Sequence, residues 1–353
     1  MRKMQEFIVK DNRIFVGLED SKKTWKLCVR SEGMIVHQTS MPTKYENLRN
    51  YLTHRYPGCR VKVIYEAGFQ GFWLHDLLKE DGFECIVTPP NKVVQEKDNR
   101  VKTDKIDASR LAKNLEHGDY RSCHVPDKEL REDRQISRTL DQIQKDIKRT
   151  KSRLRMMLYY HGLHTDLPDE TWKPSDYERL REISVGDSLK IAFDATLDLL
   201  GKLGALRNRL MKAMQRLCKK ERYEKSAALK ASSPGIGWLS AIRFTLEWGD
   251  MSRFANGKKM GSFSGLTSGE YSTGDTVRRG RITKQSSPRV RAWLIECAWR
   301  AIKLDPVLLH KYRQVWKHSG SKKKAIVAVA RKLAVRMRIV EVRQTPYCIG
   351  VSE

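Results

Sequence analysis

Two long apolar stripes at helical spacing constrain the fold of this chain more than any other feature. The first runs from about Asp127 to Gly162 and contains Ile136, Leu140, Ile143, Ile147, Leu154 and Met157. The second runs from about Ser188 to Lys220 and contains Leu189, Phe193, Leu200, Leu203, Leu210, Met214 and Leu217. A period near 3.5 residues predicts that the central region, residues 121–228, forms long helices of the coiled-coil type. Each stripe can pack within the chain or against a second copy of it.

The segment before the stripes, residues 1–120, alternates apolar and polar residues in short runs. Residues 7–38 show this alternation, and the runs RIFVGLE, TWKLCVR and MIVHQT predict three antiparallel strands. A helix over 43–56, a strand at VKVIYEAG, a helix over 70–81, a strand at ECIVTPP and a helix over about 104–117 are expected to follow. This order predicts a mixed α/β domain.

The segment after the stripes, residues 229–345, is helical in pattern and strongly basic. It predicts helices at about 238–248, 256–264, 287–304 and 323–339, separated by GEYSTGDTVRRGRITKQSSPRVR and by LDPVLLHKYRQV. Residues 200–353 hold 33 Lys and Arg against 10 Asp and Glu, so this region carries +23 of the net charge of +27. A charge that large in one region implies a polyanionic partner, most simply a nucleic acid.

Several classes of protein are excluded by what the sequence lacks. The seven cysteines stand singly and form no CxxC pair, which argues against a disulfide framework or a zinc cluster. No apolar run approaches the roughly 20 residues that cross a bilayer. The start, MRKMQEFIVKDNR, has no apolar core of signal-peptide length. We expect a soluble, cytoplasmic protein without a membrane partner.

Acidic residues stand where strands and a helix of the α/β domain end or begin. Glu19 and Asp20 close the strand IFVGLED, and Glu66 closes VKVIYE. Asp104 and Asp107 lie three residues apart in KTDKIDA and therefore share one helix face. Gathered carboxylates repel one another unless divalent cations neutralise them, and Mg²⁺ prefers carboxylate and phosphate oxygens. Taken singly, such acids are also ordinary helix-dipole partners and surface charges.

Several motifs together carry a resemblance to a known family. They are VGLEDSKKTW, IYEAGFQGFWLHDLL, KTDKIDASRLA, SSPGIGWLSAIRFTLEWGDMSRF, FSGLTSGEYSTGD and RRGRITKQSSPRVR. From about residue 14 to residue 340 the chain resembles the DEDD transposases of bacterial insertion sequences. That family has a RuvC-like, RNase H-like N-terminal domain and a C-terminal serine domain, and its studied members are guided by a bridge RNA.

The resemblance implies a set of Mg²⁺ ligands in residues 1–120. The family's four acids correspond to Glu19, Glu66, Asp104 and Asp107. The family reads Gly-Ile-Asp at the first acid, whereas this chain reads Gly17-Leu18-Glu19 and continues with Asp20. We favour Glu19, because neighbouring strand residues point to opposite faces and Asp20 can substitute only if the strand slips.

The resemblance also places a nucleophile in the basic stretch after residue 268. The family pattern is Tyr or His, one variable residue, Ser and then Gly. Here the sequence is Tyr271-Ser272-Thr273-Gly274, so Thr273 stands in register and Ser272 stands one position before it. We favour Ser272, whose primary hydroxyl is less crowded, and keep Thr273 as the alternative. The alcohol needs a base or a cation for activation, and the carboxylate-bound metal is the candidate.

Cationic and glycine-rich segments near the nucleophile are expected to bind phosphates. The cations are Arg278, Arg279, Arg281 and Lys284, with arginine suited to bidentate contact. Pro234–Gly237 (PGIG) resembles the hairpin of a helix-hairpin-helix segment, in which the backbone amides of Gly235 and Gly237 can hold a phosphate. A plain helix start has the same sequence.

The expected function is that of a transposase, a site-specific DNA recombinase that moves an insertion sequence through a covalent protein–DNA intermediate. The resemblance implies a composite site made of carboxylates and hydroxyl. It implies a guide RNA, DNA ends and target as partners, a homo-oligomer, and association with the nucleoid. The alternatives are a RuvC-like nuclease that uses metal-activated water and a noncatalytic nucleic-acid binder. The domain boundaries expected are 1–120, 121–228 and 229–345.

Overall fold

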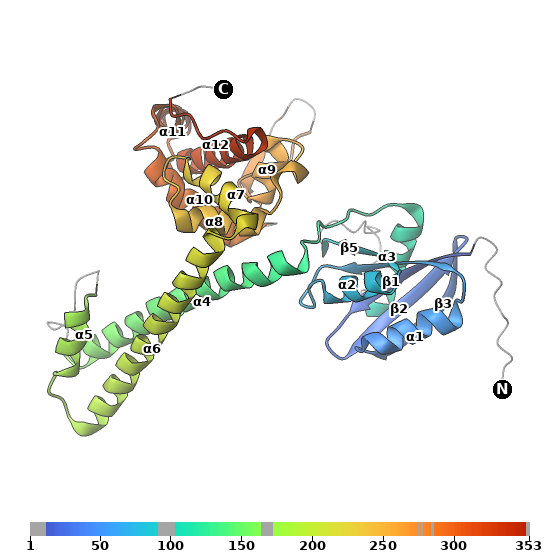
Figure 1. The fold of residues 1–353 in the computed structure, drawn as a ribbon, viewed down its shortest axis with the longest axis horizontal. Coiled ribbons are helices and arrows are strands. Elements are labelled where there is room, and N and C mark those ends of the chain that lie inside the picture. The colour runs from blue at the N-terminus through green and yellow to red at the C-terminus, as the bar shows by residue number, and fades with distance from the viewer. Residues whose placement is uncertain are drawn as a thin grey trace. The chain divides into compact units, whose positions relative to one another are not determined.

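The computed structural model describes residues 12–90, 103–163, 172–273, 276, 278–283 and 286–350, without the side chains of Pro174 and Arg279. The chain divides into two compact units, Met1–Val125 and Pro126–Glu353 (Figure 1).

The first unit is a five-stranded mixed sheet with helices on both faces. Its elements are β1 (Arg13–Asp20), β2 (Thr24–Ser31), β3 (Met34–Pro42), α1 (Tyr45–Arg55), β4 (Arg60–Glu66), α2 (Trp73–Glu80), β5 (Glu84–Thr88) and α3 (Asp104–His117). The strand order is β3-β2-β1-β4-β5, with β1, β2 and β3 antiparallel and with β4 parallel to both β1 and β5. The predicted meander and the alternation that follows it are confirmed. This arrangement is consistent with an RNase H-like domain.

The two faces of the sheet bury different residues of β1, because successive side chains of a strand point to opposite sides. Ile14, Val16 and Leu18 belong to a core that also contains residues of α1 and α2. On the other face, α3 lies close to the sheet over Gly17. A Cβ at that position would stand 2.1 Å from the Ala108 carbonyl oxygen. Only glycine allows this approach, so Gly17 fixes where α3 lies.

The second unit begins with the two predicted long helices. They are α4 (Lys128–Tyr160) and α6 (Asp187–Cys218), with the short α5 (Pro174–Arg181) between them. Leu140 of α4 packs with Met214 and Leu217 of α6, and Leu154 packs with Phe193 further along. The two stripes therefore pack against each other within one chain.

The rest of the second unit is a helical domain around one large core. Its elements are α7 (Glu221–Ala231), α8 (Trp238–Trp248), the 3-10 helix η3 (Met251–Arg253), α9 (Gly257–Phe263), β6 (Ser268–Glu270), β7 (Arg279–Ile282), α10 (Pro288–Ala301), α11 (Pro306–Ser319) and α12 (Lys322–Arg343). The four predicted helices are confirmed. The core holds residues of all of these helices, from Ala227 of α7 to Met337 of α12.

Two segments expected to separate helices have regular structure of their own. LDPVLLHKYRQV forms most of α11, which Asp305 caps through the Val307 amide and which Pro306 begins. Part of the basic stretch after residue 268 forms the antiparallel pair β6–β7. In the part of the chain that is described, no helix is both long enough and apolar enough to cross a membrane.

Candidate functional site

Two of the predicted acids stand at the carboxyl ends of neighbouring parallel strands. Strand β1 pairs with β4 in a register that sets Leu18 beside Tyr65. One residue further along, Glu19, the next-to-last residue of β1, lies beside Glu66, the last residue of β4, and both are half-buried.

Helix α3 brings the other two acids to the same end of the sheet. Glu116, near its C-terminus, is salt-bridged at 2.7 Å to Arg30, which pairs with Phe15 of β1. Ala108 contacts the sheet at Gly17, two residues before Glu19. From Ala108 back to Asp104 the helix advances about 6 Å, and from Gly17 to Glu19 the strand advances about the same. The N-terminus of α3 therefore lies toward the end of β1 that carries Glu19.

These acids also lie on the same face of the sheet. Residues 15, 17 and 19 of β1 point toward α3, since Phe15 packs with Leu111 and Leu115 and Gly17 touches Ala108. On β4, Ile64 packs with Leu111 and Leu115, so Glu66 also points to this side. Thr88, paired with Glu66 across β4 and β5, is fully buried there, and its hydroxyl has no hydrogen-bond partner among the described residues.

Asp20 points to the opposite face of β1. Its Oδ1 accepts a hydrogen bond from the Trp25 indole at 3.1 Å and another from the Gln70 amide. Burial raises the pKa of the Asp20 carboxyl to about 6, an effect that these two hydrogen bonds partly offset. With Asp20 held on the α2 side of the sheet, the geometry favours Glu19 as the acid that faces α3.

The donors at this end are hard oxygen ligands, of the kind that bind Mg²⁺. Asp104 is exposed, whereas Asp107 is buried and forms a 2.6 Å ion pair with Arg110. Within the described residues, no three His, Cys, Asp or Glu side chains stand close enough together to hold a metal ion. The acids thus share an end and a face, and their convergence on one ion stays a prediction.

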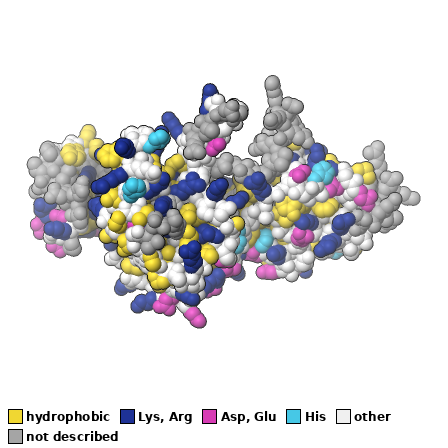
Figure 2. Space-filling view, turned by 90° about the horizontal axis from the view of Figure 1, so that it is seen from above, with side chains coloured by type: hydrophobic (Ala, Val, Ile, Leu, Met, Phe, Trp, Pro, Cys, Tyr) yellow, Lys and Arg dark blue, Asp and Glu magenta, His cyan; other side chains and the backbone are white. Residues whose placement is uncertain are grey.

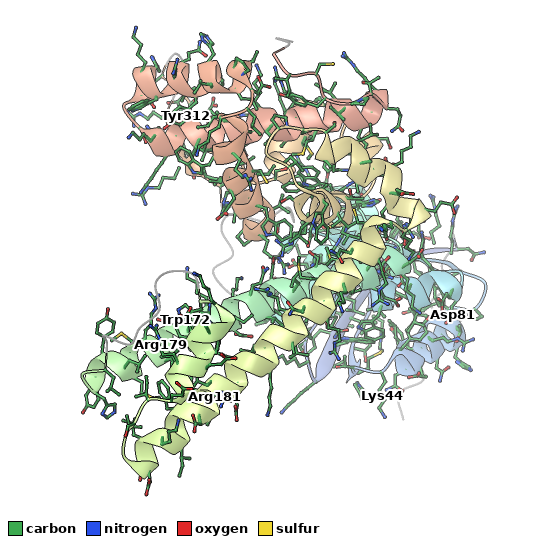
Figure 3. All side chains as sticks on the ribbon, turned by 60° about the vertical axis from the view of Figure 1, so that its left-hand side comes forward. Lys44, Asp81, Trp172, Arg179, Arg181 and Tyr312 are labelled. Carbon is green, nitrogen blue, oxygen red and sulfur yellow. The ribbon has the colours of Figure 1, made fainter. Side chains whose placement is uncertain are left out.

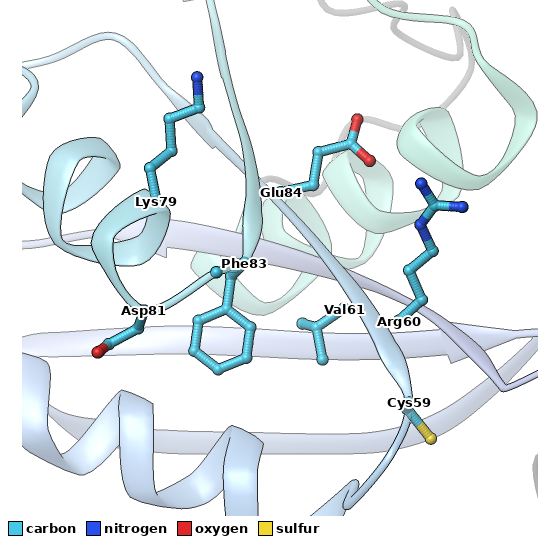
Figure 4. A pocket seen from close by; sticks show the side chains of 8 residues that line it. Cys59, Arg60, Val61, Lys79, Asp81, Phe83 and Glu84 are labelled. Atoms are coloured by element: carbon cyan, nitrogen blue, oxygen red, sulfur yellow. The ribbon is translucent and has the colours of Figure 1, made fainter.

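A shallow pocket of about 540 Å³ lies at the other end of the same sheet (Figure 4). Arg60 and Glu84, the first residues of β4 and β5, line it together with Lys79, Asp81 and Phe83. Because β4 and β5 are parallel, this pocket is separated from the acids by the length of the strands.

The predicted nucleophiles lie on a β-hairpin in the second unit. β6 and β7 pair through Glu270 and Arg279, and the pairing continues between Tyr271 and Arg278. Thr273 and Thr276 then exchange two backbone hydrogen bonds of 3.2 Å. The stretch is therefore an extended hairpin in which Ser272 and Thr273 are both exposed near the tip.

Strand alternation places the two hydroxyls on opposite faces of this hairpin. Ser272 shares its face with Glu270, and its Oγ donates a 3.0 Å hydrogen bond to Glu270 Oε1. Thr273 shares the other face with Tyr271 and with Arg278, which stands opposite Tyr271. The sequence reasoning did not identify Glu270. A spacing of two residues within a strand is the signal that could have found it.

Not all of the residues expected to bind phosphate lie among the described residues. Arg278 and Arg281 are exposed on the hairpin. The backbone of Arg279 lies in β7, and Lys284 lies outside the described residues. Gly237 precedes α8 as its N-terminal cap. Gly235 has a positive φ of 75°, and a Cβ there would stand 2.6 Å from the Cys297 carbonyl oxygen of α10, so packing alone requires glycine.

Comparisons with known proteins match both units of the chain. A family model for DEDD transposases of the IS110 type, described as "Transposase", matches residues 16–161, and a model described as "Transposase IS116/IS110/IS902 family" matches residues 227–313. The match to "Putative transposase y4rJ" of Sinorhizobium fredii is 27% identical and covers 92% of this chain and 90% of that protein. The match to "Putative transposase y4qE" of the same organism is 26% identical, over 83% and 72% of the two chains. The "Transposase for insertion sequence element IS1533" of Leptospira borgpetersenii is 23% identical, over 82% and 85%.

Proposed function

Because the chain belongs to the IS116/IS110/IS902 family of transposases, and so is a DNA-transposing enzyme, we propose that it moves an insertion sequence by forming a covalent serine–DNA bond. The observation that carries this proposal is the hydrogen bond from Ser272 to Glu270. An alcohol is a weak nucleophile at neutral pH and needs an acceptor for its proton. Of the two candidate hydroxyls, Ser272 has a carboxylate in place for that role.

The proposed step is a phosphoryl transfer from DNA to the protein. Ser272 Oγ attacks the scissile phosphorus and passes its proton to Glu270, so that an Oγ–P bond forms. The bond between phosphorus and the departing deoxyribose oxygen breaks, and that oxygen leaves with the electron pair and takes up a proton. Arg278 and Arg281, both exposed on the hairpin, support the proposal as cations for the scissile and neighbouring phosphates. The phosphoester energy is kept in the covalent bond for rejoining.

DEDD transposase domains usually use a divalent metal, and we propose Mg²⁺ at Glu19, Glu66, Asp104 and Asp107. The chemistry that such an ion supplies is neutralisation of phosphate charge during the transfer. Supporting this assignment are the shared face and end of the four acids. Asp107 must exchange its ion pair with Arg110 for the ion.

The proposal extends to the partners of the enzyme. The net charge of +23 over residues 200–353 supports binding of DNA and also of a guide RNA, since both are polyanions. Strand exchange needs more than one active site, so a homo-oligomer is part of the proposal. The pairing of α4 with α6 within one chain means that surfaces other than the two stripes would join the copies.

The test is to trap the protein on DNA that carries the ends of its own element, in the presence of Mg²⁺, and to measure a protease-sensitive adduct. We expect wild type and Thr273→Val to form the adduct and Ser272→Ala to form none. Glu270→Gln keeps the shape but loses the proton acceptor, and it should slow adduct formation about 10²- to 10⁴-fold, the usual contribution of a general base. Glu66→Gln should abolish it. Glu84→Gln, at the opposite end of the sheet and paired with Lys62, is the matched control and should leave it unchanged.

Each other outcome has a definite meaning. Loss of the adduct in Thr273→Val, with normal rates in Ser272→Ala and Glu270→Gln, would assign the nucleophile to the other face of the hairpin. Strand cleavage by wild type without any adduct would identify a nuclease that uses water. Transposition that is unchanged by Glu66→Ala would identify a noncatalytic binder.

A further inference from the structure

A row of aromatic side chains crosses the surface of α10 and α11. The centroid of the Trp299 ring lies 5.7 Å from that of the Tyr312 ring, and the Tyr312 centroid lies 6.0 Å from that of the Trp316 ring. Tyr312, labelled in Figure 3, is buried beneath, whereas each tryptophan keeps 41% of its surface exposed. Lys322 Nζ stands 5.0 Å from the centre of the Trp316 ring. We call Trp299, Tyr312, Trp316 and Lys322 the tryptophan surface.

The charge around the tryptophan surface is almost entirely positive. Residues 299–324 contain eight Lys and Arg, namely Arg300, Lys303, Lys311, Arg313, Lys317, Lys322, Lys323 and Lys324. Their one acid, Asp305, is fully buried in an ion pair with Arg336. The nearest exposed acid on α10 is Glu296, one turn before Trp299 and one turn before Arg300. Figure 2 shows Lys and Arg spread among hydrophobic side chains over the second unit.

Exposed tryptophans are not explained by the core of the unit. A tryptophan whose role is only to pack against the core would be covered by other side chains. Lysine and arginine side chains whose role is only to keep the protein soluble would need no aromatic neighbours. Flat apolar rings surrounded by cations match a ligand that has flat apolar faces and a negative backbone. Unpaired nucleic acid has both properties, because each base offers a π face and each linkage a phosphate. In a duplex the base faces are stacked on one another and cannot reach the rings.

We propose that the tryptophan surface binds an unpaired DNA strand, with bases stacked on Trp299 and Trp316 and phosphates held by Lys322 and Arg313. Arg313 precedes Trp316 by three residues on α11 and so lies beside it on the helix. The assignment rests on the proposed function in one respect, since strand cutting is what exposes such a strand. Binding itself needs neither Ser272 nor the carboxylates.

The test measures the affinity of the full chain for a labelled 20-nucleotide deoxythymidine oligomer and for a blunt DNA duplex. Trp299→Ala and Trp316→Ala should each weaken binding of the oligomer about 5- to 100-fold, the range for loss of one stacked base. Duplex affinity should stay within twofold of wild type. Trp316→Phe, which keeps a ring, should bind nearly as wild type. Trp73→Ala is the matched control, because Trp73 is 40% exposed but lies in the first unit, and it should have no effect.

The proposal is overturned if the alanine variants bind the oligomer as wild type does, or if they lose oligomer and duplex alike. An oligouridine of the same length separates the two possible strands. A loss of affinity confined to the RNA oligomer would show that the surface binds RNA and that the DNA assignment is wrong. Ser272→Ala keeps its oligomer binding if the tryptophan surface is as proposed, even where the covalent adduct never forms, so the two proposals fail separately.

Discussion

Replacing Gly17 by alanine should loosen α3 from the sheet. The new Cβ would stand 2.1 Å from the Ala108 carbonyl oxygen and 2.4 Å from the Ala112 amide nitrogen. Ordinary contacts of this kind are about 3.5 Å, so the helix must retreat by about 1.4 Å. Both obstacles are backbone atoms and no rotamer change removes them. The cost should therefore lie at the upper end of overpacking, about 3 kcal/mol.

The assay for Gly17→Ala is hydrogen exchange of the full chain, followed on peptides from α3. A loss of 3 kcal/mol corresponds to about a hundredfold faster exchange when opening is local. Because Asp104 and Asp107 sit on α3, adduct formation should fall with it. Gly201→Ala is the control: Gly201 lies in the middle of α6 with nothing within 4 Å of a new Cβ, and its replacement should stabilise that helix by about 0.5–1 kcal/mol. Unchanged α3 exchange in Gly17→Ala would refute the packing argument.

Two further predictions concern groups buried in each unit. The folded pKa of Asp20, about 6, lies above its ordinary 3.8, so the folded chain binds more protons than the unfolded chain between these values and loses stability as pH rises through that window. The Asp20→Asn variant can still accept hydrogen bonds from Trp25 and Gln70. Its melting temperature relative to that of wild type should therefore rise from pH 4 to pH 7. A difference between the two melting temperatures that stays constant over this range would contradict the prediction. Lys230, fully buried, pairs with Glu341 and has a pKa lowered by burial, so Lys230→Met should destabilise the second unit by about 3–5 kcal/mol in denaturant unfolding. Adding Glu341→Leu should recover much of that loss, and a double variant as unstable as the single one would show that the ion pair is not the cause.

Periodicity and local capping account for what the sequence predicted well. The apolar stripes gave the two long helices because 3.6-residue spacing puts one apolar face along a helix whatever it packs against. Helix α3 was expected at 104–117 and lies there, since the Thr103 hydroxyl caps its first turn and Gly118 ends it with positive φ. The segment around Asp305 carried the same kind of signal. An aspartate cap followed by proline at the first helical position begins α11, although the apolar pattern of this run predicts only a separator between helices.

What the sequence could not decide depends on which residues face each other across elements. Glu19 and Asp20 are adjacent in the sequence, and the position of α3 over Gly17 shows that Glu19 lies on the side of the sheet that faces α3, whereas Asp20 bonds to Trp25 on the other side. Ser272 and Thr273 are adjacent in the sequence, and the sequence favours Ser272 only because its hydroxyl is less crowded, since it does not show which face each side chain occupies. Once the stretch is a paired hairpin, alternation separates the two hydroxyls and brings Glu270 to Ser272. Residue types and their periods are thus local properties that the sequence alone determines, whereas the face of each side chain follows from strand pairing and helix packing between distant segments, which only the tertiary structure supplies.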